Sequence, residues 1–221
     1  MKLGILGACG FVGSYLCDYL YDDFDEIVMT DVVDLPEEYK NDGQIQFLKG
    51  SITNQDLMNS VAEMCDVVLV IASVGMSSVG MMDKKMCFDV NVGGVEVVVK
   101  ACKREESKVR LLIYTSSYNV CFDGKRAING DETSHPPLSP DSFNDFYSLT
   151  KMLAEDIVLK ADENQNKNQN KNQLTTLALR PPAIYGEGEV RHFSRICALM
   201  DQGVYTFKFR KGEEEEGFEQ F

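Results

Sequence analysis

Short apolar runs alternate along the chain with segments whose apolar residues recur every three or four positions. The first run, 2–6, stops at a glycine cluster, and the segment that follows, 11–21, has helical spacing. Further apolar runs predict strands at 27–29, 45–48, 67–71, 110–115 and 174–179. Helical periodicity predicts helices after Asn54, which can serve as an N-cap, over 84–104 and over 144–161. This alternation indicates an α/β fold, with a doubly wound parallel sheet covered on both faces.

Three segments depart from the alternation. Residues 163–173 read ENQNKNQNKNQ, which cannot bury apolar surface, so we expect a disordered insertion between a helix and a strand. Residues 119–142 contain turn signals and three prolines, which predict a loop. The last residues, KGEEEEGFEQF, form an acidic tail that we interpret as a solvated end.

The composition narrows the class of protein. The 221 residues are 44% hydrophobic and carry a net charge of −13, which argues against a nucleic-acid partner and against docking on anionic lipid. No apolar run approaches the ~20 residues of a transmembrane segment, and the N-terminus does not follow the pattern of a signal peptide. The seven cysteines include no C-x-x-C pair. They favour a reducing compartment, so we expect a cytoplasmic protein.

The first predicted strand runs directly into a glycine-rich segment, GACGFVG, that opens a helix. Gly7 would allow the tight turn, and Gly10 would let backbone amides approach a pyrophosphate. Gly13 would let the helix pack closely on the sheet. The phosphates would lie at the positive end of the helix, so an acidic chain needs no lysine or arginine to hold them. The strand before and the helix after are the context that a dinucleotide site requires.

Asp31 ends the second predicted strand. A carboxylate at this position accepts hydrogen bonds from the adenosine ribose hydroxyls and repels a 2′-phosphate. Val32 and Val33 follow it in the sequence, without a basic residue beside them. The pattern therefore predicts NAD as the cofactor in preference to NADP.

Tyr147 and Lys151 form a Y-x-x-x-K pair on a predicted helix, where a spacing of four residues places both side chains on one face. A cationic lysine beside the phenol would stabilise the phenolate, as general acid/base chemistry requires. Ser117 follows the fifth predicted strand, at the edge where ligands bind in open α/β sheets. A Ser/Thr turn is a fair interpretation of Ser116.

Together these motifs resemble the extended short-chain dehydrogenase/reductases. The matching pieces, in family order, are GACGFVG (7–13), Asp31, GSIT (50–53), NVGG (91–94), YTSSYNV (114–120), YSLTK (147–151) and LRPPAIYGEGE (179–189). Within this superfamily, IASVGM, YTSSYNVCFDGK, INGDETSHPP and YGEGEVRHF are most similar to the 3β-hydroxysteroid dehydrogenase/isomerase branch. The same fold also hosts sugar-nucleotide epimerases and dehydratases.

The resemblance implies a role for each matching position. Tyr147 would be the general acid/base, and Lys151 would hold the nicotinamide ribose. Ser117 would orient the substrate oxygen, and Asn91 would support the lysine region through a polar network. No metal site is expected. The expected cofactor contacts are Gly7, Gly10, Phe11, Val12, Gly13, Asp31, Ser51, Ile52, Ala72, Tyr147, Lys151, Pro181 and Ile184.

The chain departs from the family pattern in three ways. Ser51 stands where relatives usually carry an aspartate that contacts adenine, which weakens that contact, and Val70 stands where they usually carry a histidine. Relatives also continue into a substrate-binding lobe, which is largely missing here. We therefore expect an NAD-binding Rossmann domain over 1–190, and a remnant of the lobe with the acidic tail over 191–221. Within that remnant only 193–200 and 204–209 could add a helix and a strand.

Three hypotheses for function follow. The first is an NAD-dependent oxidoreductase that acts on the CH–OH/ketone group of a steroid-like or other apolar alcohol. The second is an NAD-dependent sugar-nucleotide epimerase or dehydratase, and the third is a truncated, non-catalytic NAD-binding protein. The resemblance also implies a small-molecule substrate, and a homodimer formed through the helices at 84–104 and 144–161.

Overall fold

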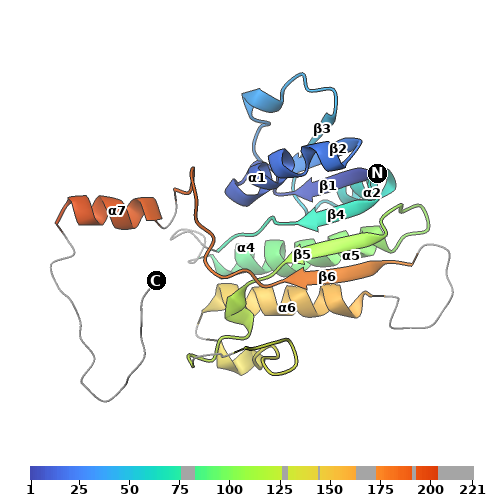
Figure 1. Ribbon diagram of the computed structural model, residues 1–221. Helices are drawn as coiled ribbons and strands as arrows, with labels where there is room; N and C mark the ends of the chain where they lie inside the picture. Colours follow the sequence, from blue (N-terminus) through green and yellow to red (C-terminus); the bar gives the residue numbers. More distant parts are fainter. Residues whose placement is uncertain (76–82, 126–128, 144, 163–172, 191–192, 204–221) are drawn as a thin grey trace, which may run out of the picture. The chain divides into compact units, whose positions relative to one another are not determined.

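The computed structural model describes residues 1–75, 83–125, 129–143, 145–162, 173–190 and 193–203 (Figure 1). The contacts within the chain divide it into two units, Met1–Ile184 and Tyr185–Phe221. The insertion predicted at 163–173 lies outside the described residues except for Gln173, and the strand expected at 204–209 lies wholly outside them. The domain boundary expected at residue 190 stays a prediction.

The first unit is built on a six-stranded sheet, all of whose pairings are parallel. The strands are β1 (Lys2–Leu6), β2 (Glu26–Asp31), β3 (Ile45–Lys49), β4 (Val67–Val70), β5 (Leu111–Thr115) and β6 (Thr175–Leu179). Their order is β3-β2-β1-β4-β5-β6, so the direction of winding reverses between β1 and β4. This confirms the predicted doubly wound fold, in which ligands bind beyond the carboxyl ends of the strands at the reversal.

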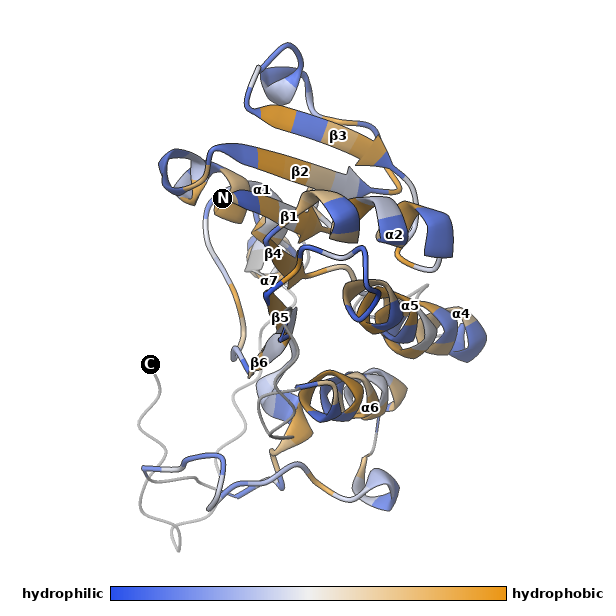
Figure 2. Cartoon of the chain, turned by 90° about the vertical axis from the view of Figure 1, so that its right-hand side faces the viewer, coloured by the Kyte–Doolittle hydropathy of each residue, from blue (hydrophilic) through white to orange (hydrophobic). Residues whose placement is uncertain are grey.

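Helices flank the sheet on both sides (Figure 2). In the first unit they are α1 (Phe11–Tyr19), α2 (Gln55–Met64), α4 (Lys84–Phe88), α5 (Gly94–Cys102) and α6 (Phe146–Lys160). Figures 1 and 2 place α1 on one face and α2, α5 and α6 on the other. The second unit contains α7 (Phe193–Asp201). None of the described helices is long and apolar enough to cross a membrane.

Short irregular helices complete the framework. A π-helical turn, Asp89–Gly93, joins α4 to α5, so the helix predicted over 84–104 is interrupted by one wide turn. Four 3₁₀ turns lie at Tyr21–Asp23, Glu37–Tyr39, Tyr118–Val120 and Pro140–Ser142. Asn54 caps α2 as predicted, because its side-chain oxygen accepts a hydrogen bond from Leu57 N at 3.1 Å.

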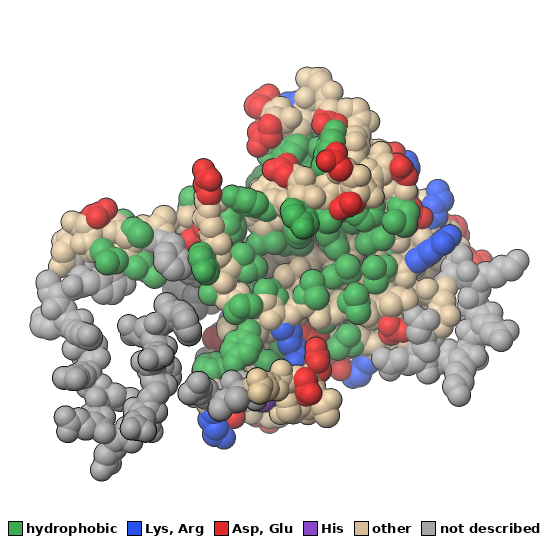
Figure 3. All heavy atoms as spheres, viewed as in Figure 1, with side chains coloured by type: hydrophobic (Ala, Val, Ile, Leu, Met, Phe, Trp, Pro, Cys, Tyr) green, Lys and Arg blue, Asp and Glu red, His purple; other side chains and the backbone are tan. Residues whose placement is uncertain are grey.

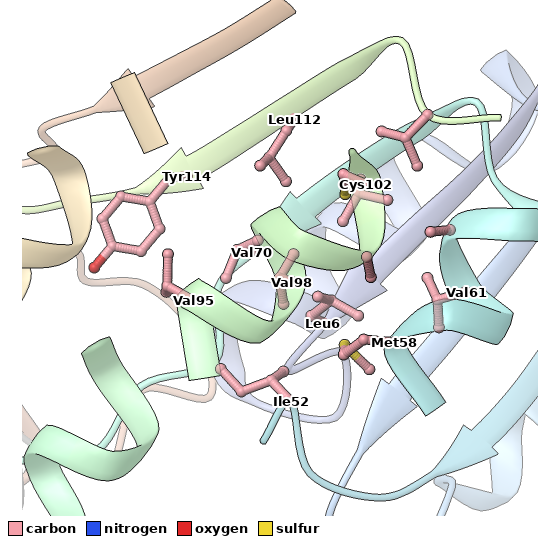
Figure 4. Packing of buried hydrophobic residues seen from close by; sticks show 14 of the residues in the cluster. Leu6, Ile52, Met58, Val61, Val70, Val95, Val98, Cys102, Leu112 and Tyr114 are labelled. Carbon is pink, nitrogen blue, oxygen red and sulfur yellow. The ribbon is translucent and has the colours of Figure 1, made fainter. Parts of the chain in front are cut away.

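Two buried apolar clusters lie on opposite faces of the sheet. The larger one packs strand residues such as Leu6, Val70 and Leu112 against α2 and α5 (Figure 4). The smaller one packs Ile5 and Met29 against residues of α1. Because alternate strand residues enter the two clusters, β1, β2 and β4 are buried along most of their length.

The face that carries α1 is only partly covered within the described residues of the first unit. Leu177 and Leu179 of the edge strand β6 are exposed, whereas Thr176 before them is buried and Ala178 between them is half-buried. Figure 3 is viewed from the α1 side and shows apolar side chains gathered over the strands that this helix does not reach. The expectation of helices over both faces therefore holds for β1 and β2, but for β6 only on the side of α6.

Candidate active site

The glycine-rich turn is shaped by two close backbone contacts. Gly7 has φ +88°, and a Cβ there would lie 2.6 Å from Ala72 N. A Cβ on Gly13 would collide with the carbonyl oxygen of Gly7. Ala72 is fixed in turn, because its N–H donates to Leu6 O at 2.8 Å. Glycine is thus required at both positions, and the side of the turn next to β4 is closely packed.

The N-terminus of α1 offers unpaired backbone donors. Gly10 is the N-cap, it is exposed, and no side chain in the described part of the chain caps it. Ser14 N donates to Gly10 O at 2.9 Å, so Phe11, Val12 and Gly13 precede the first amide bonded within the helix. Free N–H groups and the positive end of the helix dipole form a binding place for phosphate.

Asp31 lies against this turn at the end of β2. Its Oδ2 accepts a hydrogen bond from Cys9 N at 3.0 Å, and its Oδ1 accepts from Val32 N at 2.7 Å. The carboxylate therefore braces the glycine-rich loop, a role that sequence analysis missed. Lys49 pairs with Asp31 in the β2–β3 register, but its amine bonds to Asp34 at 2.6 Å. The lysine charge is thus already matched by a carboxylate.

The segment after β3 divides its residues between surface and core. The Ser51 hydroxyl accepts a hydrogen bond from Thr53 N at 3.2 Å and lies 2.9 Å from the Thr53 hydroxyl. Ile52 is buried in the larger cluster, and a Cβ on Gly94 would lie 2.6 Å from it. Any contact of Ile52 with a cofactor would therefore come from its backbone, whereas Ser51 keeps a half-exposed side chain.

Tyr147 and Lys151 lie in the first half of α6, which Asp145 caps by accepting from Ser148 N at 2.7 Å. Lys151 is 2% exposed, and its Nζ donates to Thr115 O at 2.8 Å. The same Nζ lies 4.8 Å from the ring centroid of Tyr114 and 5.9 Å from that of Tyr147. The amine is therefore held between the end of β5 and the half-buried tyrosine of the Y-x-x-x-K pair.

Burial dominates the electrostatics of this place. It lowers the pKa of Lys151 to about 7, an effect that Cys87 opposes only in part. No carboxylate bonds the Lys151 amine in the described part of the chain. Near neutral pH both protonation states of the amine are accordingly populated. Burial also raises the pKa of the neighbouring Tyr114 well above its ordinary value.

Asn91 lies in the π-helical turn and is buried. Its Oδ1 accepts from Val74 N at 2.9 Å, while its Nδ2 donates to Val74 O at 2.8 Å and to Thr150 Oγ1 at 2.9 Å. The side chain thus joins the loop after β4 to the helix of Tyr147. On α6 the side chain of Asn91 therefore bonds to Thr150, the sequence neighbour of Lys151, whereas the lysine amine bonds to Thr115 O.

Ser117 follows β5 and begins a 3₁₀ turn that packs on α6. Its hydroxyl accepts from Asn119 N at 3.3 Å and is half-exposed. Ser116 is buried instead, without a partner for its hydroxyl among the described residues. Pro181 accepts a hydrogen bond from Tyr118 N at 3.0 Å, which places it beside the serine segment, and Ile184 is exposed at the end of the first unit.

Two further features were not found from the sequence. Gly75 has φ +113°, and a Cβ there would lie 2.9 Å from Cys87 Sγ and 3.0 Å from Tyr147 Cδ2. The buried Glu155 forms an ion pair with the half-buried Arg180. In the sequence, these features could have been suspected only from a glycine in the loop after β4 and from a glutamate four residues beyond Lys151.

A glycine-rich turn after β1, an acidic residue at the end of β2 and a Y-x-x-x-K helix beside a serine segment belong to one doubly wound sheet. This combination defines a protein of the extended short-chain dehydrogenase/reductase class. More narrowly, the chain belongs to the 3-beta hydroxysteroid dehydrogenase/isomerase family, whose model matches residues 4–218.

The chain is similar to two groups of named proteins. It is 37% identical over 209 residues to short-chain dehydrogenase/reductase family 42E member 1 of Danio rerio, covering 93% of this chain and 51% of that one. It is 36% identical over 193 residues to the decarboxylating sterol-4-alpha-carboxylate 3-dehydrogenase of Saccharomyces cerevisiae, covering 84% and 51%. The chain thus spans about half the length of the curated relatives it matches.

Solved structures share the fold. UDP-glucuronic acid 4-epimerase from Bacillus cereus, in complex with NAD, superposes with a TM-score of 0.72 at 21% identity, covering 91% of this chain and 64% of that one. dTDP-glucose 4,6-dehydratase from Bacillus anthracis, also with NAD, gives 0.69 at 21% identity, covering 92% and 62%. At this identity the likeness establishes the architecture alone.

Proposed function

We propose that the chain binds NAD and serves oxidation or reduction at the CH–OH/ketone carbon of a steroid-like or other apolar alcohol. The observation that carries the proposal is the place of Lys151. Its buried amine lies below the Tyr147 ring and bonds to the carbonyl of Thr115, two residues before Ser117. This bond supports a site at the carboxyl end of β5, where the lysine amine, the Tyr147 phenol and the Ser117 hydroxyl would act on one substrate oxygen.

The residues present fit NAD. The amides at the start of α1 would hold the phosphates, because the exposed Gly10 carries no side chain to cover them and Gly7 and Gly13 bring the backbone close. Asp31 retains acceptor capacity for ribose hydroxyls, and its charge opposes a 2′-phosphate. The two solved structures of the same fold named above are complexes with NAD. When bound, NAD would supply the hydride acceptor or donor.

The side chains of this chain would then move and place a proton. The Tyr147 hydroxyl would pass a proton to or from the substrate oxygen, and the Ser117 hydroxyl would donate a hydrogen bond to that oxygen. The Lys151 amine would stabilise the phenolate whenever it is protonated, and its pKa of about 7 lets it take up or release a proton near neutral pH.

The choice of an apolar alcohol is supported by the relatives. The family is named for 3-beta hydroxysteroids, and the yeast relatives are named as sterol-4-alpha-carboxylate 3-dehydrogenases. The substrate class in this proposal therefore rests on the family and its named relatives.

The test is hydride transfer by the purified 221-residue chain. NADH absorbance is followed with NAD and a panel of 3β-hydroxysterols that includes a 4α-carboxysterol, for the wild type, Tyr147→Phe and the control Tyr19→Phe. Tyr19 is an exposed tyrosine at the end of α1. We expect at least ~100-fold slower turnover in Tyr147→Phe and no change in the control.

Other results would select other functions. Equal activity of Tyr147→Phe would remove this phenol from the mechanism. Turnover of a UDP- or dTDP-sugar, with none of any sterol, would select the epimerase or dehydratase hypothesis. Calorimetric binding of NAD without turnover of either panel would select a non-catalytic NAD-binding protein.

A further inference from the structure

Glu155 and Arg180 form an ion pair, with a buried carboxylate and a half-buried guanidinium, that the proposed proton transfer does not use. Glu155 lies one helical turn beyond Lys151 on α6 and is 1% exposed, and Arg180 directly follows β6. Arg180 Nη2 donates to Glu155 Oε1 at 2.6 Å, and Nε lies 3.1 Å from both carboxylate oxygens. Nη1 donates to His135 O at 3.2 Å. All three guanidinium nitrogens are thus engaged, and the hydrogen bond to Glu155 raises the pKa of Arg180.

The backbone on either side of Arg180 holds the serine segment. Leu179 O accepts from Ser116 N at 2.7 Å, and Pro181 O accepts from Tyr118 N at 3.0 Å. Ser117 lies between these two donors in the chain. Its place beyond β5 is therefore set by the two carbonyls that flank Arg180.

The helix that carries Glu155 also carries Tyr147 and Lys151, at intervals of four residues along one face. A first tie between this helix and the serine segment is the bond from Lys151 Nζ to Thr115 O. The ion pair of Glu155 with Arg180 is a second contact of this helix, with the residue that follows β6. This contact does not depend on the protonation state of the Lys151 amine.

We infer that Glu155 and Arg180 are a positioning pair, which fixes the Ser117 hydroxyl relative to the Tyr147 phenol. The inference rests on the proposed function, in which these two hydroxyls share one substrate oxygen. A buried ion pair gains little net stability over apolar residues of similar volume, because both charges lose their water. A forked guanidinium–carboxylate contact does fix direction and distance, which packing alone leaves looser.

The variants are designed to separate the small effect of the ion pair on stability from its effect on geometry. The double variant Glu155→Met/Arg180→Met keeps the volume and leaves no unmatched charge, so it is expected to fold with a melting temperature near that of the wild type. Arg180→Lys keeps the charge but cannot form the fork. The matched control is Asp156→Asn/Lys160→Gln, which removes an exposed ion pair from the same helix.

The first measurement is amide hydrogen exchange in peptides that cover residues 115–121. In the double variant we expect exchange at Ser116 and Tyr118 to become at least ~10-fold faster, with a smaller rise in Arg180→Lys, while β1 and β2 keep their protection. The control should leave all peptides unchanged. In turnover assays, kcat should fall ~10-fold or more while the KM for NAD stays within about twofold.

The outcomes separate this inference from the proposed function. Unchanged exchange at Ser116 and Tyr118 would overturn the inference, whatever the activity. Two other results would also overturn the inference: faster exchange with an unaltered kcat, or a change that appears in the KM for NAD and not in kcat. Either result would mean that the ion pair only stabilises the structure. If the double variant does not fold, Arg180→Lys decides by the same two measurements. If the wild type turns over no alcohol, the proposed function fails, and exchange alone decides whether the pair holds the serine segment.

Discussion

The Lys151 amine makes the stability of the fold depend on pH. Burial lowers its pKa from 10.5 to about 7, whereas an unfolded chain keeps the ordinary value. Between these two values the unfolded state binds more protons than the folded state, so the contribution of Lys151 to stability rises with pH across this window and is least favourable at pH 7 and below. The difference of about 3.5 units corresponds to roughly 4 to 5 kcal/mol. A domain of this size has a total stability of only ~5–15 kcal/mol.

The perturbation that isolates this contribution is Lys151→Met, which removes the amine and keeps most of the side-chain length. The variant also loses the hydrogen bond to Thr115 O, which costs roughly 1 to 2 kcal/mol. We therefore expect it to be more stable than the wild type by roughly 2 to 3 kcal/mol at pH 7, and slightly less stable at pH 10. Lys160→Met is the control, because this amine is exposed on the same helix.

The assay is urea denaturation of the 221-residue chain at several pH values between 6 and 10, read as the difference in unfolding free energy between variant and wild type. Buried thiols and phenols titrate in both proteins, so their contributions cancel in the difference. A difference that stays constant with pH would refute the assignment of a buried, largely neutral amine. Lys160→Met should show a small difference at every pH.

Two further predictions concern the loop after β4 and the cofactor site. Gly75→Ala should lower the melting temperature and slow turnover, because the new methyl group would displace Tyr147. Gly124 also has a positive φ but open space around it, so Gly124→Ala should cost only the ~1–2 kcal/mol of backbone strain. Equal losses of melting temperature in the two variants would contradict this prediction. Asp31→Asn removes the charge opposed to a 2′-phosphate, so calorimetric titration should show about tenfold weaker NAD binding and a smaller preference over NADP. An unchanged preference would assign the discrimination elsewhere.

Most of the fold followed from local signals. Each strand is a short apolar run, and the helices show apolar residues at helical spacing. The type and order of the elements could therefore be predicted, and their bounds to within a few residues. The cap at Asn54 was predictable because capping acts within three residues. The π-helical turn at Asp89–Gly93 was not, because one extra residue shifts the period too little to be seen in a pattern of apolar positions.

The site was predictable only as separate pieces. Tyr147, Lys151 and Ser117 each stand in a motif that can be read locally, but their mutual contacts depend on how β5, β6 and α6 pack. The bond from Lys151 to a backbone carbonyl and the pairing of Glu155 with Arg180 leave no trace in local patterns. Asp31 illustrates the same limit, because its bond to Cys9 N arises only when β2 lies beside β1.

The division of the chain also fixes what experiments on it can decide. The glycine-rich turn, Asp31, Ser117, Tyr147 and Lys151 all lie within the unit that ends at Ile184. Within that unit, phosphates would be held by backbone amides and not by basic side chains, so a net charge of −13 does not oppose NAD binding. Cofactor affinity, the pH dependence of Lys151 and the order of the serine segment can therefore be measured before any alcohol is identified. The sterol and nucleotide-sugar panels then test substrate choice separately.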